Sequence, residues 1–255
     1  MEKKQTVFDV QAEMGLTKHM GGLKATRELI ELCHVDRDKY VLDVGCGVGV
    51  TSCYVAQRYG CKVVGVDISE RMIERSNERA RREGVEDSVE FRAADVQNLP
   101  FEDDLFDAVI GESITAFPED KQRTVNEYVR VTKPGGYIGL NESTWMKTPV
   151  PAELVEWVSQ DLSANAEALA SDGWVGLLEG AGLRDIVART YTISVRSEFS
   201  GIIKRYGLGD MLRAWYRALS LYRRDPAYRN VVKEAGATPK NVFEYLGYGI
   251  YVGRK

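Results

Sequence analysis

Residues 41–49 read Val-Leu-Asp-Val-Gly-Cys-Gly-Val-Gly, and this stretch decides the fold. It begins as an apolar run with β-branched residues and ends with glycines at alternate positions. The pattern predicts a buried parallel strand that runs into a tight loop, with a helix starting near Thr51. Glycines let the backbone turn sharply and let a ligand approach the main chain without meeting a Cβ atom. The first turn of the helix then offers free N–H groups to a polar ligand.

A second apolar run, residues 62–67, ends in a carboxylate, Asp67, which follows Gly49 by 18 residues. In a strand–helix–strand unit, an acid at this position can accept hydrogen bonds from both hydroxyls of an adenosine ribose. The glycine spacing is G-x-G-x-G, whereas NAD sites typically have G-x-G-x-x-G. Asp43, just before the loop, suits a cationic ligand better than a pyrophosphate. These features favour a nucleoside-containing ligand other than NAD.

These residues resemble motif I and the following acidic motif of the class I S-adenosylmethionine (SAM)-dependent methyltransferases. The resemblance covers about residues 38–144 and continues, in order, through Val89–Asp95, Asn98–Phe101, Phe106–Ile110 and Lys133–Gly136. The chain looks most like the small-molecule and quinone-type enzymes that carry a Leu-Pro-Phe loop. The resemblance implies SAM as cofactor and S-adenosylhomocysteine as product. It also implies an α/β fold with a Rossmann-like seven-stranded sheet, in the order 3-2-1-4-5-7-6 with the last strand antiparallel, and a helical cover.

The resemblance also implies cofactor contacts. Asp67 is expected to bind the ribose, Ile68 to lie against the adenine, and Asp95 to accept from the adenine amine, unless Asp95 only forms an Asx turn. The glycine pair at 21–22 either caps a helix or folds over the methionine end of SAM, whose carboxylate suits a helix N-terminus. The full set of expected cofactor-binding residues is Gly21, Gly22, Asp43, Gly45, Cys46, Gly47, Gly49, Asp67, Ile68, Asp95, Val96 and Gly111.

Two residues are candidates for acid–base catalysis. His19, one of only two histidines, directly precedes Met20 and the glycine pair, although a packing or surface role is the alternative. Glu112 follows the predicted fourth strand, at the carboxyl end of the sheet, where open α/β sheets bind ligands. A base is needed only if the acceptor is protonated. Glu142, at the end of the next strand, is a second acid that could line the pocket.

Composition excludes several classes of function. The 255 residues carry a net charge of −4 with both signs evenly mixed, so a nucleic-acid binder is not indicated. The cysteines at 33, 46, 53 and 61 form no C-x-x-C pair, which argues against a disulfide framework or a metal site and for a cytoplasmic setting. No apolar run approaches the ~18 residues of a membrane span, and no signal peptide is visible. The expected partner is a small-molecule substrate, and a homodimer stays open.

The chain is expected to form one structural domain in three parts. Residues 1–37 form an N-terminal arm and cap helix, 38–144 the SAM-binding core, and 145–255 the C-terminal half of the sheet with an inserted helical substrate cover. The polar arm, with its glycine hinge at 21–22, is expected to close over the methionine half of SAM. The patterns predict helices over 51–59, 120–131, 151–169, 172–179 and 198–235, and strands over 185–194 and 248–252.

Arginines and aromatic residues interleave over residues 204–229. Such a pattern can bind nucleic acid or an anionic membrane surface. We expect instead that Leu212, Trp215 and Tyr216, together with Leu219, pack on the core or cover the substrate pocket while the arginines point to water.

The leading hypothesis is methyl transfer from SAM to a small molecule by in-line displacement, in which the protein positions the reactants and excludes water. Gly111–Ile114 stand where amide-modifying relatives carry Asn-Pro-Pro-Tyr, which argues against amide methylation. The rivals are a non-catalytic SAM-binding protein and, disfavoured by the glycine spacing, an NAD-dependent oxidoreductase. The sequence names neither the acceptor nor the atom that is methylated.

Overall fold

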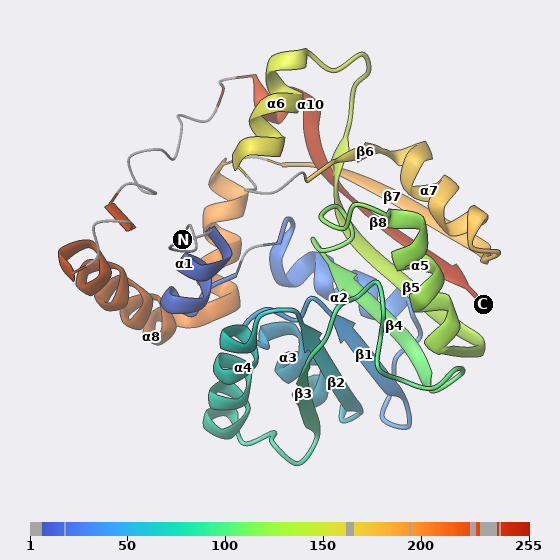
Figure 1. Ribbon diagram of the computed structural model, residues 1–255, viewed down its shortest axis with the longest axis horizontal. Coiled ribbons are helices and arrows are strands. Elements are labelled where there is room, and N and C mark those ends of the chain that lie inside the picture. Colours follow the sequence, from blue (N-terminus) through green and yellow to red (C-terminus); the bar gives the residue numbers. More distant parts are fainter. Residues whose placement is uncertain are drawn as a thin grey trace.

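The computed structural model describes residues 7–17, 19–161, 166–193, 195–224, 228–229, 239 and 241–255. Its centre is one sheet with the strand order β3-β2-β1-β4-β5-β8-β7 (Figure 1). The strands are β1 (Tyr40–Val44), β2 (Lys62–Asp67), β3 (Val89–Ala93), β4 (Phe106–Glu112), β5 (Thr132–Trp145), β6 (Leu169–Ala170), β7 (Arg184–Thr192) and β8 (Leu246–Arg254). The two-residue β6 pairs with β5 off the main path. With β6 set aside, the predicted order 3-2-1-4-5-7-6 is confirmed.

The direction of pairing places the loops that follow the strands. Strands β3, β2, β1, β4 and β5 pair in parallel, whereas β8 is antiparallel to both β5 and β7, as predicted for the last strand. Val44 at the end of β1 lies beside Val66 of β2 and Gly111 of β4. The carboxyl ends of these three strands therefore meet at one edge, where open parallel sheets bind ligands.

Helices cover both faces of the sheet (Figure 1). They are α1 (Val7–Met14), α2 (Gly22–Leu32), α3 (Val50–Tyr59), α4 (Glu70–Glu83), α5 (Lys121–Val131), α6 (Ala152–Asp161), α7 (Ser171–Gly180), α8 (Val195–Arg224) and α10 (Val242–Tyr245). Helices α2, α3 and α4 pack on one face, and α5 and α7 on the other. The centre of the sheet is thus buried on both sides, which explains why β1, β2 and β4 are mainly apolar, whereas the edge strands β3 and β7 are more polar and more exposed.

Three predicted boundaries are wrong. Strand β3 ends at Ala93, before Asp95. Residues 134–136, whose Pro-Gly-Gly sequence is typical of a turn before a strand, instead form a bulge inside β5, because Phe106 pairs with Thr132 but Ala108 pairs with Tyr137. The helix predicted over 151–169 ends as α6 at Asp161, and residues 169–170 form β6 instead, because β5 continues to Trp145 and supplies a pairing edge.

The helical prediction over 198–235 is confirmed for residues 198–224, but the expectation that Leu212, Trp215 and Tyr216 pack on the core is wrong. Helix α8 is broken at Gly207 (φ 71°, ψ 168°), a conformation essentially confined to glycine. Beyond the break, Leu212, Trp215 and Tyr216 are 65–71% exposed, because Asp210 and Ala214 occupy the inward face. Residues 225–227 and 230–235 of the predicted helix lie outside the described residues.

Candidate functional site

The glycine loop after β1 packs tightly against side chains from other parts of the chain. Gly45, Gly47 and Gly49 have φ angles of 65°, 54° and 73°, in the left-handed region that favours glycine. A Cβ atom on Gly47 would lie 2.7 Å from the methyl carbon of Thr17, in the N-terminal arm. Ile114 lies over Gly45 in the same way. The arm therefore lies directly beside this loop, and no larger residue fits at Gly45 or Gly47 without movement of these side chains.

Asp67 is the last residue of β2, and both of its carboxylate oxygens accept hydrogen bonds from backbone N–H groups. One oxygen accepts from the N–H of Gly47 (3.0 Å) and the other from the N–H of Ser69 (2.9 Å). Burial raises the pKa of Asp67, while these two hydrogen bonds act in the opposite direction. The neighbouring Ile68 is 77% exposed, unusually high for a large aliphatic side chain in this fold. The tip of β2 thus presents an anchored carboxylate beside an uncovered apolar side chain.

Asp95 and Val96 lie just beyond β3, one exposed and one buried. The Asp95 carboxylate accepts from the N–H of Gln97 (2.9 Å), which is the geometry of an Asx turn. The side chain of Val96 packs in the core with Leu42 and Val64. Asp95 is exposed, so its carboxylate remains accessible to a ligand.

Glu112, at the end of β4, is the centre of a buried polar cluster. Its side chain is 5% exposed and accepts from the hydroxyls of Thr26 in α2 (2.9 Å) and Thr51 in α3 (2.6 Å). Nδ1 of His19 lies 3.0 Å from the Glu112 carboxylate. The two predicted acid–base residues are therefore in direct contact, although 93 positions separate them in the chain.

Arg205, in the first half of α8, completes this cluster. Its guanidinium contacts Nε2 of His19 and donates to the hydroxyl of Thr51 (3.1 Å). Burial, reinforced by Arg205, lowers the pKa of His19 well below 6.5, so the imidazole is neutral. Burial raises the pKa of Glu112, and Arg205 opposes that shift. Nε of Arg205 is buried and has no hydrogen-bond partner, an arrangement that is costly unless another group meets it.

Asp43, Cys46 and Gly111 form the floor of this edge. Asp43 is 2% exposed and accepts from the hydroxyl of Ser52 (2.5 Å), which ties β1 to α3. Burial raises its pKa to about 7, and Glu112 adds to that shift. Cys46 is buried and its N–H donates to the carbonyl of Val66 (2.9 Å). The Asp43 carboxylate faces into the fold and not toward the open edge.

Glu142 supports the loop after β4. It is fully buried and accepts from the N–H groups of Ile114 (3.0 Å) and Thr115 (2.7 Å). Burial raises its pKa to about 7. Its neighbour Asn141 donates to the carbonyl of Met20 (3.0 Å) and so ties the arm to β5. Glu142 therefore stabilises the loop after β4 from the protein interior and does not line an open pocket.

The glycine pair before α2 is packed against protein. A Cβ atom on Gly21 would meet the ring of Tyr248, and one on Gly22 would approach the backbone of Gly201 in α8. Gly21 is the N-terminal cap of α2, with a φ of 78°. Helix capping and close packing account for both glycines without a ligand.

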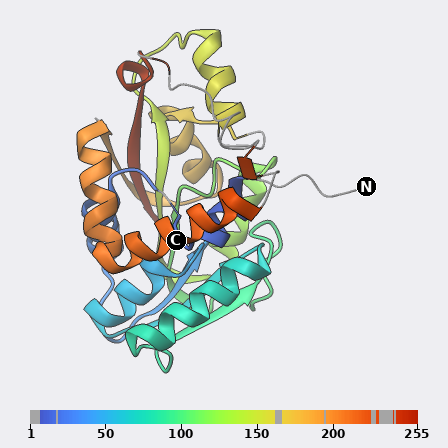
Figure 2. The same cartoon turned by 90° about the vertical axis from the view of Figure 1, so that its left-hand side faces the viewer.

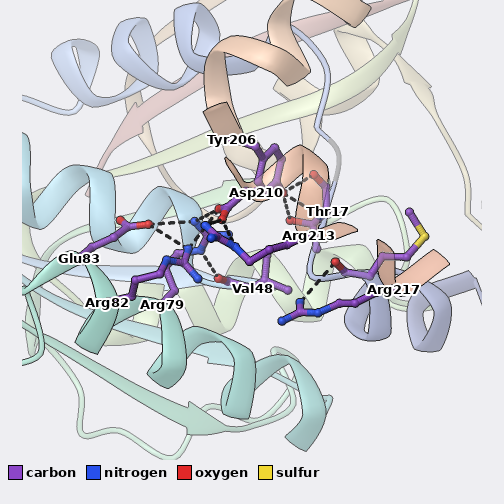
Figure 3. Close-up of polar contacts among 10 residues, drawn as sticks. Thr17, Val48, Arg79, Arg82, Glu83, Tyr206, Asp210, Arg213 and Arg217 are labelled. Atoms are coloured by element: carbon purple, nitrogen blue, oxygen red, sulfur yellow. Dashed lines mark hydrogen bonds and ion pairs between the residues drawn. The ribbon is translucent and has the colours of Figure 1, made fainter. Parts of the chain in front are cut away.

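A second group of contacts fastens α8 over the glycine loop (Figure 3). The Tyr206 hydroxyl donates to the carbonyl of Thr17 (2.6 Å) and accepts from its N–H (2.7 Å). Asp210 accepts from Arg79 of α4 (2.9 Å), and Arg79 also donates to the carbonyl of Val48 in the loop (2.9 Å). We call these four side chains, Thr17, Arg79, Tyr206 and Asp210, the clasp.

Three residues of this cluster were not predicted from the sequence: Arg205, Thr26 and Thr51. Both threonines lie in the opening turns of predicted helices, and Arg205 lies in the arginine-rich segment 204–229. The available signal was the position of Arg205 just before the Gly207 break, where a helix must change direction.

Comparison with known proteins places the chain among methyltransferases. Residues 41–136 match the family model described as a methyltransferase domain. An uncharacterized protein of Haemophilus influenzae is 31% identical over 189 residues, covering 73% of this chain and 75% of that one. Methyltransferase GfsG of Streptomyces halstedii is 35% identical over 64% of this chain, which spans 59% of that enzyme. Phosphoethanolamine N-methyltransferase 1 of Arabidopsis thaliana is 30% identical over 72% of this chain, which spans only 36% of that enzyme.

Solved structures share the fold over nearly the whole chain. The [4+2]-cyclase SpnF superposes with a TM-score of 0.72 and 19% identity, covering 98% of this chain and 93% of that one. A SAM-dependent methyltransferase from Thiobacillus denitrificans superposes with a TM-score of 0.70 and 20% identity, covering 97% of both chains. At such identities the likeness establishes the fold alone.

Proposed function

The chain belongs to the SAM-dependent methyltransferase family, and from that premise we propose that it methylates a small molecule bearing an ionisable O–H or N–H group. The observation that carries this proposal is the buried His19–Glu112 pair beside the glycine loop. Both named enzymes among the relatives are methyltransferases, and the name of one of them specifies phosphoethanolamine. The quinone-type subclass suggested by the Leu-Pro-Phe loop would satisfy the same chemistry if the acceptor is the reduced hydroquinone, whose ring hydroxyls are ionisable.

The residues at the carboxyl edge fit SAM. The anchored carboxylate of Asp67 keeps lone pairs free for ribose hydroxyls, and the exposed Ile68 offers an apolar surface for adenine. The unpartnered Nε of Arg205 is a buried donor near the same loop, where a carboxylate group could satisfy it. When bound, SAM supplies a methyl group already activated by its positively charged sulfur. Within this proposal, Gly45, Gly47, Gly49, Asp95 and the backbone of Val96 remain cofactor contacts, while Asp43, Cys46 and Gly111 shape the floor.

His19 is the proposed general base. Glu112 faces Nδ1, so Nε2 is the nitrogen left to accept a proton from the acceptor. The neutral imidazole is already in the form that a base needs. Glu112 would stabilise the imidazolium that forms, and Arg205 must withdraw from Nε2 before the proton can move. Arg205 therefore blocks Nε2 of His19 until it moves away. Because Arg205 lies in α8, a movement of this helix would both open the site and free the base.

The proposal is tested by comparing His19→Gln with His34→Gln. The protein is incubated with methyl-labelled SAM and a metabolite extract, and S-adenosylhomocysteine formation is followed. Loss of a general base costs typically 10²–10⁴-fold in rate, and we expect a loss in that range for His19→Gln. The matched control removes the other histidine, which is exposed and lies tilted against the ring of Tyr137, and should keep the rate.

The pH dependence separates a base from a structural residue. Because the pKa of His19 is lowered below 6.5, the active neutral form should persist below that pH. The wild-type rate should therefore fall only in more acidic solution, and the variant should lack this acidic limb. Equal rates for the two histidine variants would remove His19 from catalysis. Binding of SAM without any turnover would favour the non-catalytic alternative.

A further inference from the structure

The second half of α8 carries an apolar face that the rest of the described chain leaves open. Beyond Gly207, positions i, i+4, i+7, i+11 and i+14 fall on one side of a helix. We define the α8 stripe as these residues and Tyr216 beside them: Leu208, Leu212, Trp215, Tyr216, Leu219 and Tyr222. Four of them are 65–74% exposed and Tyr222 is 44% exposed. Surface apolar residues scattered singly need no explanation, but a contiguous stripe marks an interaction surface.

The stripe is bordered by positive charge. Residues 208–224 hold four arginines and one acid, although the chain as a whole has a net charge of −4. Arg223 and Arg224 are exposed, and Arg213 is 51% exposed. Figure 2 shows the second half of α8 on the same side of the molecule as α4, whose Arg71 and Arg82 form ion pairs with Glu13 and Asp210. The positive charge at the border of the stripe therefore comes mainly from the exposed Arg223 and Arg224, because Arg213 is also paired with Asp210.

From this combination we propose that the α8 stripe docks onto an anionic lipid surface. Leucine, tryptophan and tyrosine on one face of a helix, with arginines at its flanks, suit burial at the boundary between headgroups and acyl chains. The arginines meet anionic headgroups while the aromatic rings lie at the interface. No helix of the described residues is long and apolar enough to cross a bilayer, so the helix would lie on the surface.

Two other occupants fit less well. A second copy of the chain would need about 20–30 residues on each side for a stable interface, and the stripe offers six residues of one helix. Single-stranded nucleic acid would use the arginines and the aromatic rings, but the stripe's three leucines would gain nothing from it. Both alternatives are outcomes of the test below.

Docking at this helix also bears on the site. Arg205 and Tyr206 precede Gly207 in the same helix and contact His19 and Thr17. A lipid surface that holds the second half of α8 would therefore lie next to the segment that covers the acceptor. This placement suits an acceptor that partitions into lipid. The docking itself is independent of the proposed methyl transfer and can be measured without turnover.

The chain contains its own reporter for this contact. Trp145 and Trp174 are buried and Trp157 is half-buried, whereas Trp215 is 65% exposed. Vesicles of phosphatidylcholine, with and without phosphatidylglycerol, are added to the full chain in low and high salt, and tryptophan emission and co-sedimentation are recorded. We expect binding only to the anionic vesicles, weakened by salt, with a blue shift of emission that Trp215→Phe removes.

Variants on the stripe supply the decisive comparison. The double variant Leu212→Glu, Trp215→Glu should lose about tenfold or more in vesicle affinity, and Arg223→Ala about fivefold. Val155→Glu, at a 47%-exposed apolar position on α6, is the matched control and should bind like the wild type. Circular dichroism and SAM binding establish that each variant is folded.

Four results would overturn the proposal. They are absence of vesicle binding by the folded wild type, equal binding to neutral vesicles, undiminished binding of the double variant, and a dimer or an oligonucleotide complex that depends on the stripe and forms without vesicle binding.

Discussion

At the scale of single residues, burial sets the chemistry of this edge more than residue type does. Asp43, Glu112 and Glu142 are buried acids with raised pKa values, and His19 is a buried base with a lowered one. Burial disfavours the charged form in every case, so each shift moves the group toward neutrality. The edge therefore carries less charge than the same side chains would carry in water. His19 is thus available there as a neutral base, shielded from solvent.

Burial raises the pKa of Asp67 as well, but both of its oxygens also accept from backbone N–H groups, which oppose that shift. We predict that Asp67→Asn leaves the fold intact but weakens SAM binding by about ten- to a hundredfold, since a charged hydrogen bond is worth about 1.5–3 kcal/mol. Calorimetric titration with SAM measures the change. Asp87→Asn, at an exposed acid in the loop before β3, is the control and should bind like the wild type. Identical affinities for the two variants would exclude Asp67 from the cofactor site.

Glu142 gives a prediction on stability. Its pKa is about 7 in the folded protein and about 4.5 when unfolded, so between these values only the folded chain holds the proton. The contribution of Glu142 to the free energy of unfolding is therefore lost as pH rises through this window. Glu142→Gln does not titrate, so its stability relative to the wild type should improve from pH 4.5 to pH 7.

Urea unfolding midpoints across this pH range check the prediction for Glu142. Glu153→Gln, at an exposed position on α6, serves as the control and should show a constant difference from the wild type. A constant difference for Glu142→Gln as well would mean that its carboxyl group titrates normally.

At the scale of elements, the ends of helices could be predicted from the sequence, because the residues at those ends determine them. Gly60 ends α3 with a φ of 75°, directly after the helix predicted over 51–59, and Ser69 caps α4 by accepting from the N–H of Met72. The orientation of α8 was not predictable in this way. Its inward face is chosen by the ion pair of Asp210 with Arg79, which lies 131 residues away in the sequence. Helical periodicity identifies an apolar face but does not say whether the protein or another surface covers it.

The clasp gives a prediction at this scale. Tyr206→Phe removes the hydroxyl that serves both backbone groups of Thr17, and leaving those groups unpaired costs about 1–3 kcal/mol. The arm and the first half of α8 should then open more often and exchange amide hydrogens faster. Tyr216→Phe, on the exposed side of the same helix, is the matched control and should exchange like the wild type.

Hydrogen exchange followed by mass spectrometry, resolved over residues 7–17 and 195–206, measures this opening. Unchanged protection in Tyr206→Phe would mean that the arm is held by other contacts, such as that between Asn141 and Met20.

At the scale of the whole molecule, the site forms where three distant parts of the chain meet. The core supplies Asp67 and Glu112, the arm supplies His19, and α8 supplies Arg205. The first three could be predicted because each stands at the end of a strand or beside a glycine pair. Arg205 could not, because its partners His19 and Thr51 lie 186 and 154 residues away, and the nearby Gly207 indicates a helix break but not which side chain the break positions. The arm and α8 both pack against the glycine loop at this edge, so movement of either one would change access to the proposed site.

Methyl transfer to a small molecule is best tested by following where the methyl group of SAM goes. The wild-type chain is incubated with methyl-labelled SAM and a whole-cell extract, and the reaction is divided by ultrafiltration. We predict that S-adenosylhomocysteine forms in equal amount to a labelled product in the low-mass fraction. Label retained with protein or nucleic acid, or SAM bound with no S-adenosylhomocysteine formed, would contradict the claim.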